Sequence, residues 1–222
     1  MAFVENSKVY NRHLPMMQIM FGACMRVSET IGLTWSDIDM KNREIHVSGQ
    51  VVYDEGDNGY CFHESAPKTE SGVRTIPMTQ MVYEAFRRQK EINLQLGLHS
   101  NVEIGGRRGF IFNSKNGRPI MPAGVNSYLR NIVNAYNKKE TKTAEEEYRE
   151  LELMPHISAH ILRHSGCTRL GENNVNPKVM QYIMGHSDAN ITMNIYNHIA
   201  NISQVESEMD KMERDINDSS VV

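Results

Sequence analysis

The segment GHSDANITMNIYNH (residues 185–198) places a histidine and a tyrosine ten residues apart, with Thr192 between them. The chain has nine tyrosines, so position alone does not make Tyr196 special. A tyrosine that follows an isoleucine is most often a half-buried packing residue. The alternative is a reactive phenol that works together with His186, and the remainder of the sequence has to decide between these two interpretations.

Size and composition are those of an ordinary globular protein. The 222 residues are 40% apolar and 23% charged, which suits one large domain or two small ones. No apolar run approaches the roughly 20 residues that span a bilayer, and the N-terminal MAFVENSKVYNRH lacks the pattern of a signal peptide. We therefore expect a cytoplasmic protein without a membrane partner. The three cysteines lack metal-ligand spacing, so we expect buried free thiols.

The net charge of −3 does not indicate a nucleic-acid-binding protein, but the charges are unevenly distributed. Residues 107–142 hold eight basic residues and one acidic residue, whereas residues 201–222 hold six acidic and two basic residues. A local excess of positive charge can follow a phosphate backbone. A solvated basic surface explains the same charges equally well.

Hydrophobic periodicity and turn residues predict an α+β fold that is mainly α. We expect a small antiparallel sheet near the front of the chain, with strands at 44–53, near 60–66 and at 73–77. We expect helices at 14–33 with a break at Gly22, at 79–92, at 121–138, and from about 158 onward. Residues 139–152, KETKTAEEEYRELE, are predicted to be a mobile charged segment on the surface. These elements form one domain over residues 1–200, followed by a helical tail at 201–222.

The segment HILRH (residues 160–164) offers two kinds of site. On a helix His160 and Arg163 share a face, where a guanidinium fork and a titratable imidazole suit a phosphate. A structural pair that holds a carboxylate is the alternative. His160 and His164 have the spacing of the zinc-binding helix motif, but that motif needs a glutamate directly after the first histidine, where this chain has Ile161. We therefore do not expect a metal site.

Two basic residues nearer the N-terminus are also open to two interpretations. Arg26 follows an apolar stretch, and a charge there needs a partner because an unpaired buried charge is costly. Glu29 is the structural candidate for that partner, and a phosphate is the functional one. Lys68 lies near a turn of the predicted sheet, where it is either solvated or able to reach a ligand as a proton donor.

The order of these residues is more specific than any one of them. The chain reads R-V-S-E from Arg26, P-K-T-E-S-G-V-R around Lys68, H-I-L-R-H from His160, G-H ending at His186 and I-Y ending at Tyr196. This order resembles that of the tyrosine recombinase (phage integrase) family over about residues 10–199, and especially the integrases of conjugative transposons and phages. One departure is Cys24, where family members often carry glycine.

The resemblance implies a fold, a reaction and a set of catalytic residues. The fold is that of a tyrosine recombinase catalytic domain, and the reaction is site-specific cleavage and rejoining of double-stranded DNA through a 3′-phosphotyrosyl intermediate. No metal or other cofactor is implied, because two arginines can neutralise the phosphate. The implied roles are nucleophile for Tyr196, stabilisers of the phosphate charge for Arg26 and Arg163, a phosphate hydrogen bond for His186, protonation of the leaving 5′-oxygen for Lys68 and proton transfer from the tyrosine for His160.

The resemblance also implies partners and a larger protein. Such recombinases act as tetramers on DNA, so we expect a homo-oligomer, and they carry an N-terminal core-binding domain, so we expect this chain to be a truncated or partial form. Arg74 is expected to touch the DNA backbone and His164 to be structural. The acidic tail has an apolar stripe close to a heptad pattern, which packs either on the chain's own core or on a neighbouring protomer: Ile202, Val205, Met209, Met212 and Ile216.

Three other functions are compatible with some of these features. A type IB topoisomerase uses similar chemistry as a monomer, but the tail and the integrase-like spacing argue against it. A non-catalytic DNA-binding regulator would keep the fold, although the complete set of catalytic positions argues for an enzyme. A zinc hydrolase that uses His160 and His164 is the remotest alternative.

Overall fold

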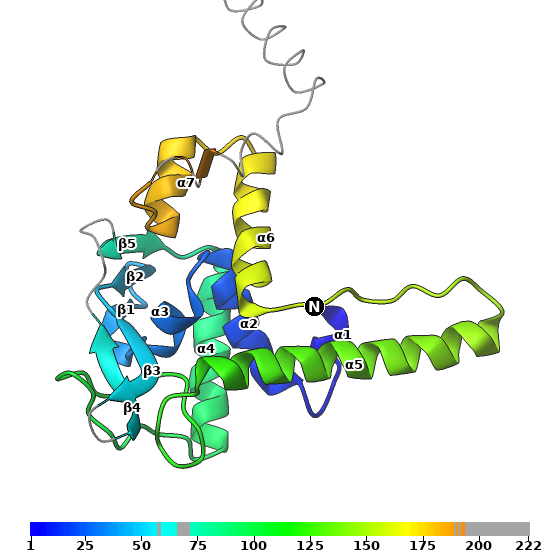
Figure 1. Ribbon diagram of the computed structural model, residues 1–222, viewed down its shortest axis with the longest axis horizontal. Helices are drawn as coiled ribbons and strands as arrows, with labels where there is room; N and C mark the ends of the chain where they lie inside the picture. The colour runs from blue at the N-terminus through cyan, green and yellow to red at the C-terminus, as the bar shows by residue number, and fades with distance from the viewer. Residues whose placement is uncertain (57–58, 66–71, 189, 191, 194–222) are drawn as a thin grey trace, which may run out of the picture.

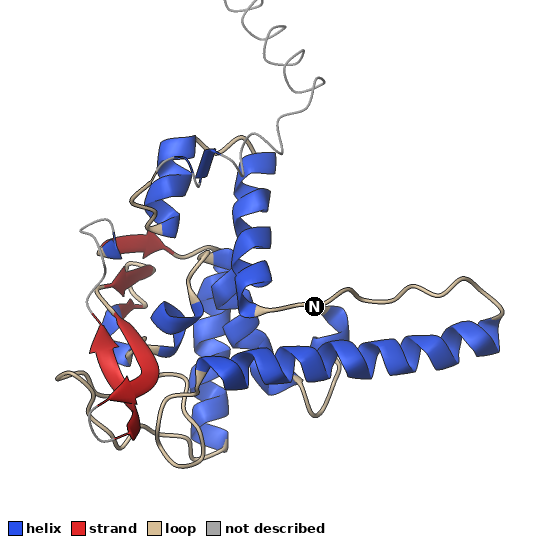
Figure 2. Ribbon diagram, viewed as in Figure 1, coloured by secondary structure: helices blue, strands red, loops and turns tan. Residues whose placement is uncertain are grey.

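The computed structural model describes residues 1–56, 59–65, 72–188, 190, 192 and 193. Helices dominate this part of the chain, and two small antiparallel sheets lie at one side of them (Figures 1 and 2). No helix in the described ranges is both long and apolar enough to cross a membrane. The helices are α1 (Ala2–Glu5), α2 (Leu14–Gly22), α3 (Val27–Ile31), α4 (Gln80–Gln95), α5 (Pro122–Glu147), α6 (Ala159–Glu172) and α7 (Pro177–Met184), with 3-10 turns η1 (Asn11–His13) and η2 (Trp35–Asp37).

The strands form two sheets where the sequence predicted one. A three-stranded sheet has the order β1-β2-β5, and β3 and β4 form a separate hairpin. The predicted strand at 44–53 is therefore two strands in different sheets, interrupted at Ser48 and Gly49, because glycine weakens a strand and permits the bend. The strands are β1 (Ile38–Asp39), β2 (Glu44–Val47), β3 (Gln50–Gly56), β4 (Gly59–Ser65) and β5 (Arg74–Pro77).

Helix α2 lies at the centre of the core. Its sequence LPMMQIMFG is apolar on nearly every side, and six of its residues are buried. It packs against α4 and α6, and burying each large apolar side chain there contributes about 1.5–3 kcal/mol. The predicted break at Gly22 is confirmed, since α2 ends there and α3 starts at Val27. This break turns the chain so that the residues between the two helices face α6 and α7.

Helix α5 continues nine residues beyond its predicted end and projects from the body as an arm (Figure 1). The chain then runs back along the arm to α6. Glu140 holds this return segment, because its two carboxylate oxygens accept from Arg149 at 2.5 and 2.8 Å. The amide of Asn137 exchanges two hydrogen bonds with the backbone of Met154 at 2.8 and 3.0 Å. The prediction of a mobile segment at 139–152 is therefore wrong for these residues.

Candidate active site

Three of the six predicted site residues lie in one cluster. Arg26, Arg163 and His186 come from separate segments of the chain and meet beside the C-terminal end of α7. Lys68 and Tyr196 lie outside the described residues, and their roles stay predictions. The tail at 201–222 also lies outside them.

The C-terminal end of α7 supplies backbone acceptors to this cluster. The helix ends at Met184, and its C-cap Gly185 has a φ of 61°, in the left-handed region that favours glycine. The turn leaves two carbonyls available to side chains. Arg163 Nη2 donates to the carbonyl of Met184 at 2.7 Å. Arg26 Nη2 donates to the carbonyl of Gly185 at 3.2 Å. Both arginines are thereby held next to the histidine that follows the turn.

A buried carboxylate lies among the arginines. Glu29 on α3 is 5% exposed. Its Oε1 accepts from Arg26 Nη1 and its Oε2 from the backbone N–H of Arg26, both at 2.8 Å. Arg74 donates to the same two oxygens at 3.1 and 3.0 Å. Burial alone would raise the pKa of Glu29, but hydrogen bonding to Arg74, its charge and the contacts of Arg26 lower that pKa, which keeps Glu29 ionised at neutral pH.

Arg74 is an internal part of this cluster. Its side chain is fully buried, with 0% exposed. Besides Glu29, it donates from Nε to the carbonyl of Ile183 at 2.7 Å and from Nη1 to that of Gly72 at 3.2 Å. The prediction that Arg74 touches the DNA backbone is therefore wrong. The alternation of β5 carried the signal, because it places Arg74 on the same buried face as Ile76.

Arg163 lies deeper than Arg26. It is 5% exposed, and its Nη1 donates to the carbonyl of Cys24 at 2.7 Å. The same nitrogen lies 3.7 Å from Oε2 of Glu29. Burial, together with the neighbouring positive charges of Arg26 and Arg74, lowers the pKa of Arg163 to about 10. The guanidinium therefore remains charged at neutral pH.

Two backbone features let α6 approach the loop between α2 and α3. A Cβ at Gly166 would lie 2.0 Å from the carbonyl oxygen of Phe21, so only glycine fits there. Cys24 has a φ of 51°, in the left-handed region, which explains why glycine suits this position in the family it resembles. Cys24 and Cys167 are buried free thiols as predicted, whereas Cys61 is exposed. Burial, the leading cause, raises the pKa of Cys24 to about 12, so its thiol is neutral.

His186 connects Arg163 to the chain that follows α7. It is 8% exposed, and its Nε2 lies 3.0 Å from Arg163 Nη2. Its Nδ1 lies 3.0 Å from Oγ1 of Thr192. Burial, followed by the charges of Arg163, Arg26 and Arg74, lowers the pKa of His186 to about 4. His186 is therefore neutral at pH 7 in this state of the site.

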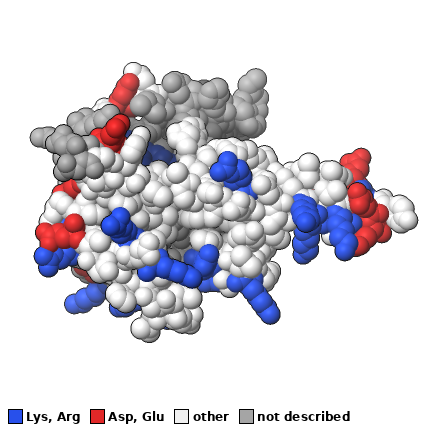
Figure 3. All heavy atoms as spheres, turned by 60° about the horizontal axis from the view of Figure 1, so that its bottom comes forward, with Lys and Arg blue, Asp and Glu red and all other residues white. Residues whose placement is uncertain are grey.

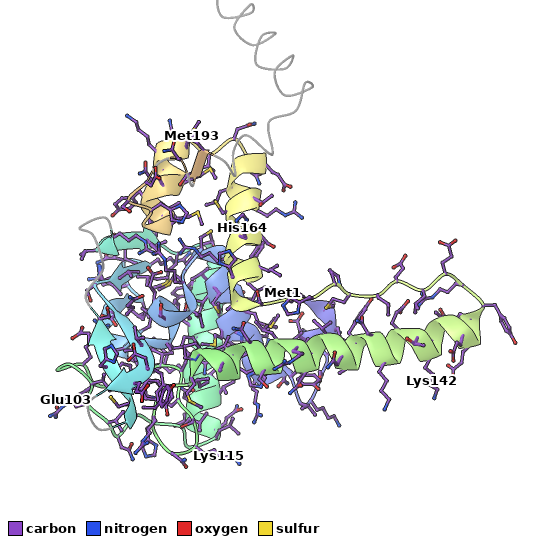
Figure 4. All side chains as sticks on the ribbon, in the orientation of Figure 1. Met1, Glu103, Lys115, Lys142, His164 and Met193 are labelled. Atoms are coloured by element: carbon purple, nitrogen blue, oxygen red, sulfur yellow. The ribbon has the colours of Figure 1, made fainter. Side chains whose placement is uncertain are left out.

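His160 lies one turn before Arg163 on α6 and is exposed. Its ring centroid is 5.5 Å from that of His164, which Figure 4 labels on the same helix. Burial, together with the charges of His160 and Arg163, lowers the pKa of His164. Among the described residues, His160 makes no hydrogen bond with the arginine cluster. It is available to a ligand that approaches along this face of α6.

The cluster has an excess of positive charge. Three guanidinium groups and one carboxylate leave two uncompensated positive charges beside a neutral His186. Arg26 is the accessible member, with 39% of its side chain exposed. Such a site suits an anion with oxygen acceptors, because the arginine donors are already oriented. In the part of the chain that the structure describes, no group of three or more His, Cys, Asp or Glu side chains is placed to hold a metal ion.

Comparison with known proteins identifies the family. The model of the phage integrase family matches residues 1–202. The chain belongs to the phage integrase family. The expected fold class is confirmed as well, since the integrase of transposon Tn1549, solved in complex with a circular intermediate DNA, superposes with a TM-score of 0.81. That protein is 35% identical, and the match covers 95% of this integrase-family chain and 62% of the solved chain.

Curated relatives of this integrase-family chain include transposases and recombinases. The transposase of transposon Tn916 from Enterococcus faecalis is 33% identical over 97% of this chain and 49% of its own length. A XerC-like tyrosine recombinase from Caldanaerobacter subterraneus is 30% identical over 81% of this chain and 44% of its own length. The chain therefore spans about half the length of the curated relatives it matches. The XerA recombinase, at 18% identity and a TM-score of 0.59, shares the fold.

Proposed function

We propose that this chain is the catalytic part, residues 1–200, of a tyrosine-type site-specific DNA recombinase that acts in the cytoplasm. One observation carries the proposal: Arg26, Arg163 and His186 converge on a positively charged site, and Tyr196 follows ten residues later in the sequence. Membership of the phage integrase family and relatives named as transposases and recombinases support it. A similar integrase was solved with DNA, which supports double-stranded DNA as the substrate.

In the proposed reaction the phenolic oxygen of Tyr196 attacks a DNA phosphodiester. A bond from phosphorus to the tyrosine forms while the bond from phosphorus to the 5′-oxygen breaks. The energy of the phosphodiester is retained, so a 5′-hydroxyl can reverse the step. His160 accepts the phenolic proton, and Lys68 donates a proton to the leaving oxygen. Each of these roles rests on the family resemblance and on the chemistry of the residue type.

The two arginines would stabilise the charge that builds on the non-bridging oxygens. Both are oriented before a substrate arrives, which reduces the reorganisation needed in the transition state. Arg26 is accessible, so the hydrogen bond that it donates to the carbonyl of Gly185 at 3.2 Å can be exchanged for one to a phosphate oxygen. Arg163 is buried and supplies a fixed charge behind it. Neither role requires a metal ion.

Basic side chains on the surface support binding to the DNA backbone. Figure 3 shows Lys and Arg side chains over the body and along the arm, with acidic side chains at the end of the arm. Lys138 and Lys139 on α5 are exposed. Arg107, Arg108 and Lys142 are instead paired with carboxylates. Only part of the basic field predicted for residues 107–142 is therefore available to phosphates.

Assembly as a homo-tetramer on DNA is part of the proposal. The acidic tail at 201–222 is proposed to dock its apolar stripe on a neighbouring protomer, with packing on its own core as the alternative. Deleting residues 201–222 is expected to weaken assembly on DNA, measured by sedimentation of the protein–DNA complex. Unchanged assembly would favour the alternative.

The test of the reaction is a covalent adduct. Wild type first selects its preferred sequence from a pool of randomised duplexes, and the selected DNA is prepared as nicked half-sites that trap the intermediate. The incubation is at low salt, where phosphate contacts are strongest. We expect an adduct on a denaturing gel for wild type and none for Tyr196→Phe.

The same experiment separates the alternatives. DNA binding without an adduct in either protein would favour a non-catalytic regulator. A Tyr196-dependent adduct together with relaxation of supercoils at random sites would favour a type IB topoisomerase. An adduct confined to a selected sequence is the result expected of a recombinase.

A further inference from the structure

Thr192 is the buried partner of the site histidine. It is 1% exposed, and its Oγ1 lies 3.0 Å from Nδ1 of His186. It stands four residues before Tyr196 in the sequence. A threonine hydroxyl on the surface would exchange hydrogen bonds with water and would not be tied to one partner. At this position it faces an imidazole that is itself 8% exposed, so the contact is shielded from water on both sides.

The neighbours of His186 decide which nitrogen carries the proton. Arg163 Nη2, at 3.0 Å from Nε2, has only hydrogens to offer, so Nε2 must accept. In the neutral ring the proton then lies on Nδ1. That N–H points at Thr192, whose hydroxyl oxygen can accept it. An Nε2–H tautomer would set two donors against each other at the arginine.

We propose that Thr192 is a positioning residue that, together with Arg163, fixes the tautomer and ring orientation of His186 in the proposed recombinase reaction. Arg163 disfavours a proton on Nε2, and the Thr192 hydroxyl adds an acceptor for the proton on Nδ1, so that Nε2 is the nitrogen directed at Arg163 and at an arriving phosphate. The proposal rests on the proposed function only for its catalytic consequence. The tautomer itself is a property of the chain alone.

The contact also serves the charged form of the histidine. His186 faces the positive Arg163 from α6, Arg26 before α3 and Arg74 from β5, and among the described residues Glu29 is the negative group that acts on it. A bound phosphate adds negative charge and favours protonation at Nε2. Nδ1 is protonated in both forms, so Thr192 keeps the same hydrogen bond, while Nε2 gives up the hydrogen bond it accepts from Arg163 and donates one to the phosphate instead. The change of protonation is thereby confined to the nitrogen that faces the substrate.

The first test measures the tautomer in the free chain. Long-range proton–nitrogen NMR spectra of the histidine rings are recorded for wild type, Thr192→Val and Thr192→Ser, with His186 assigned by the signal lost in His186→Gln. We expect the Nδ1–H tautomer in wild type and Thr192→Ser, and a mixture of the two tautomers in Thr192→Val, where Arg163 still disfavours a proton on Nε2 but Nδ1–H has lost its acceptor. Thr141→Val is the matched control, because that hydroxyl bonds only the backbone of α5. An unchanged His186 tautomer in Thr192→Val would overturn the proposal.

The second test measures adduct formation against pH on the nicked DNA that wild type cleaves. A lost buried hydrogen bond predicts a fall of about tenfold for Thr192→Val, with Thr192→Ser close to wild type. The hydrogen bond between Thr192 and His186 is stronger when the imidazole is charged than when it is neutral. Losing it in Thr192→Val should therefore lower the pKa of His186 in the DNA complex and move the alkaline decline of the rate down by about one pH unit. A Thr192→Val profile identical to wild type would refute the catalytic consequence, whereas no adduct from wild type would refute the proposed function and leave the tautomer result standing.

Discussion

Replacing Arg74 by methionine is expected to destabilise the protein by removing a fully buried ion pair. The side chain has 0% exposure and makes four hydrogen bonds, two to Glu29 and two to the carbonyls of Ile183 and Gly72. Methionine has a similar length and no donors. The substitution therefore leaves a carboxylate and two carbonyls without the partner that now satisfies them.

The magnitude follows from what remains around Glu29. Arg26 still donates to both carboxylate oxygens, so the negative charge of Glu29 keeps one partner. Arg26 is 39% exposed, however, and water partly screens its charge. Removing one member of a buried ion pair costs about 3–5 kcal/mol. A domain of this size loses roughly 2–4 °C in Tm for each kcal/mol. We expect Arg74→Met to lower Tm by about 6–20 °C.

The dependence on pH tests the cause. Because the pKa of Glu29 is lowered in the folded state, its ionisation contributes stability above its unfolded pKa of about 4.3, and that stability is lost as the pH falls. Arg74→Met removes much of this contribution, so the difference from wild type should narrow at pH 4 relative to pH 7 in urea denaturation. Arg169→Met, which removes an exposed pair, is the control and should stay within about 0.5 kcal/mol of wild type. A loss below 1 kcal/mol at pH 7, or an equal loss at both pH values, would refute the reasoning.

Three further predictions concern packing and titration. Gly166→Ala should lower the free energy of unfolding by about 1–3 kcal/mol, because the new methyl group meets the backbone of Phe21. Gly124→Ala, where the methyl group has room, should not lower it, and urea denaturation of both variants makes the comparison. In the native protein Cys61 should react quickly with a thiol reagent and the two buried cysteines only after unfolding, as counted by absorbance. Hydrogen bonding to Arg149 lowers the pKa of Glu140 to about 2, so the return segment should stay attached at pH 4 and detach as the pH falls toward 2. The backbone N–H of Glu152 donates to Glu140, so the NMR shift of that amide reports the attachment. Detachment already at pH 4 would contradict the prediction.

The sequence identified the family and predicted the positions of most helices. The family is recognised by the order of a few motif residues along the chain, which can be read without a fold, and the proposed reaction follows from that resemblance. Helix α4 follows a clear period of buried positions, and α2 ends at Gly22 as the sequence predicted. These signals lie within single segments of the chain, so they can be recognised from the sequence without a structure.

The tertiary structure alone decided where those residues find their partners. Arg26 and Arg74 are both arginines near the front of the chain, yet one is partly exposed and the other fully buried. The arm at the end of α5 is ordered by contacts of Glu140 and Asn137 with residues further along the chain. Charge and periodicity within a segment do not encode such distant acceptors.

The histidine site shows the same division. The sequence placed His186 next to a glycine and ten residues before Tyr196, but it left the protonation of the imidazole open. Arg163, 23 residues earlier, and Thr192 assign its two nitrogens once the chain is folded. A side chain's type is written in the sequence, whereas its donors, acceptors and dielectric surroundings exist only after distant segments have packed together.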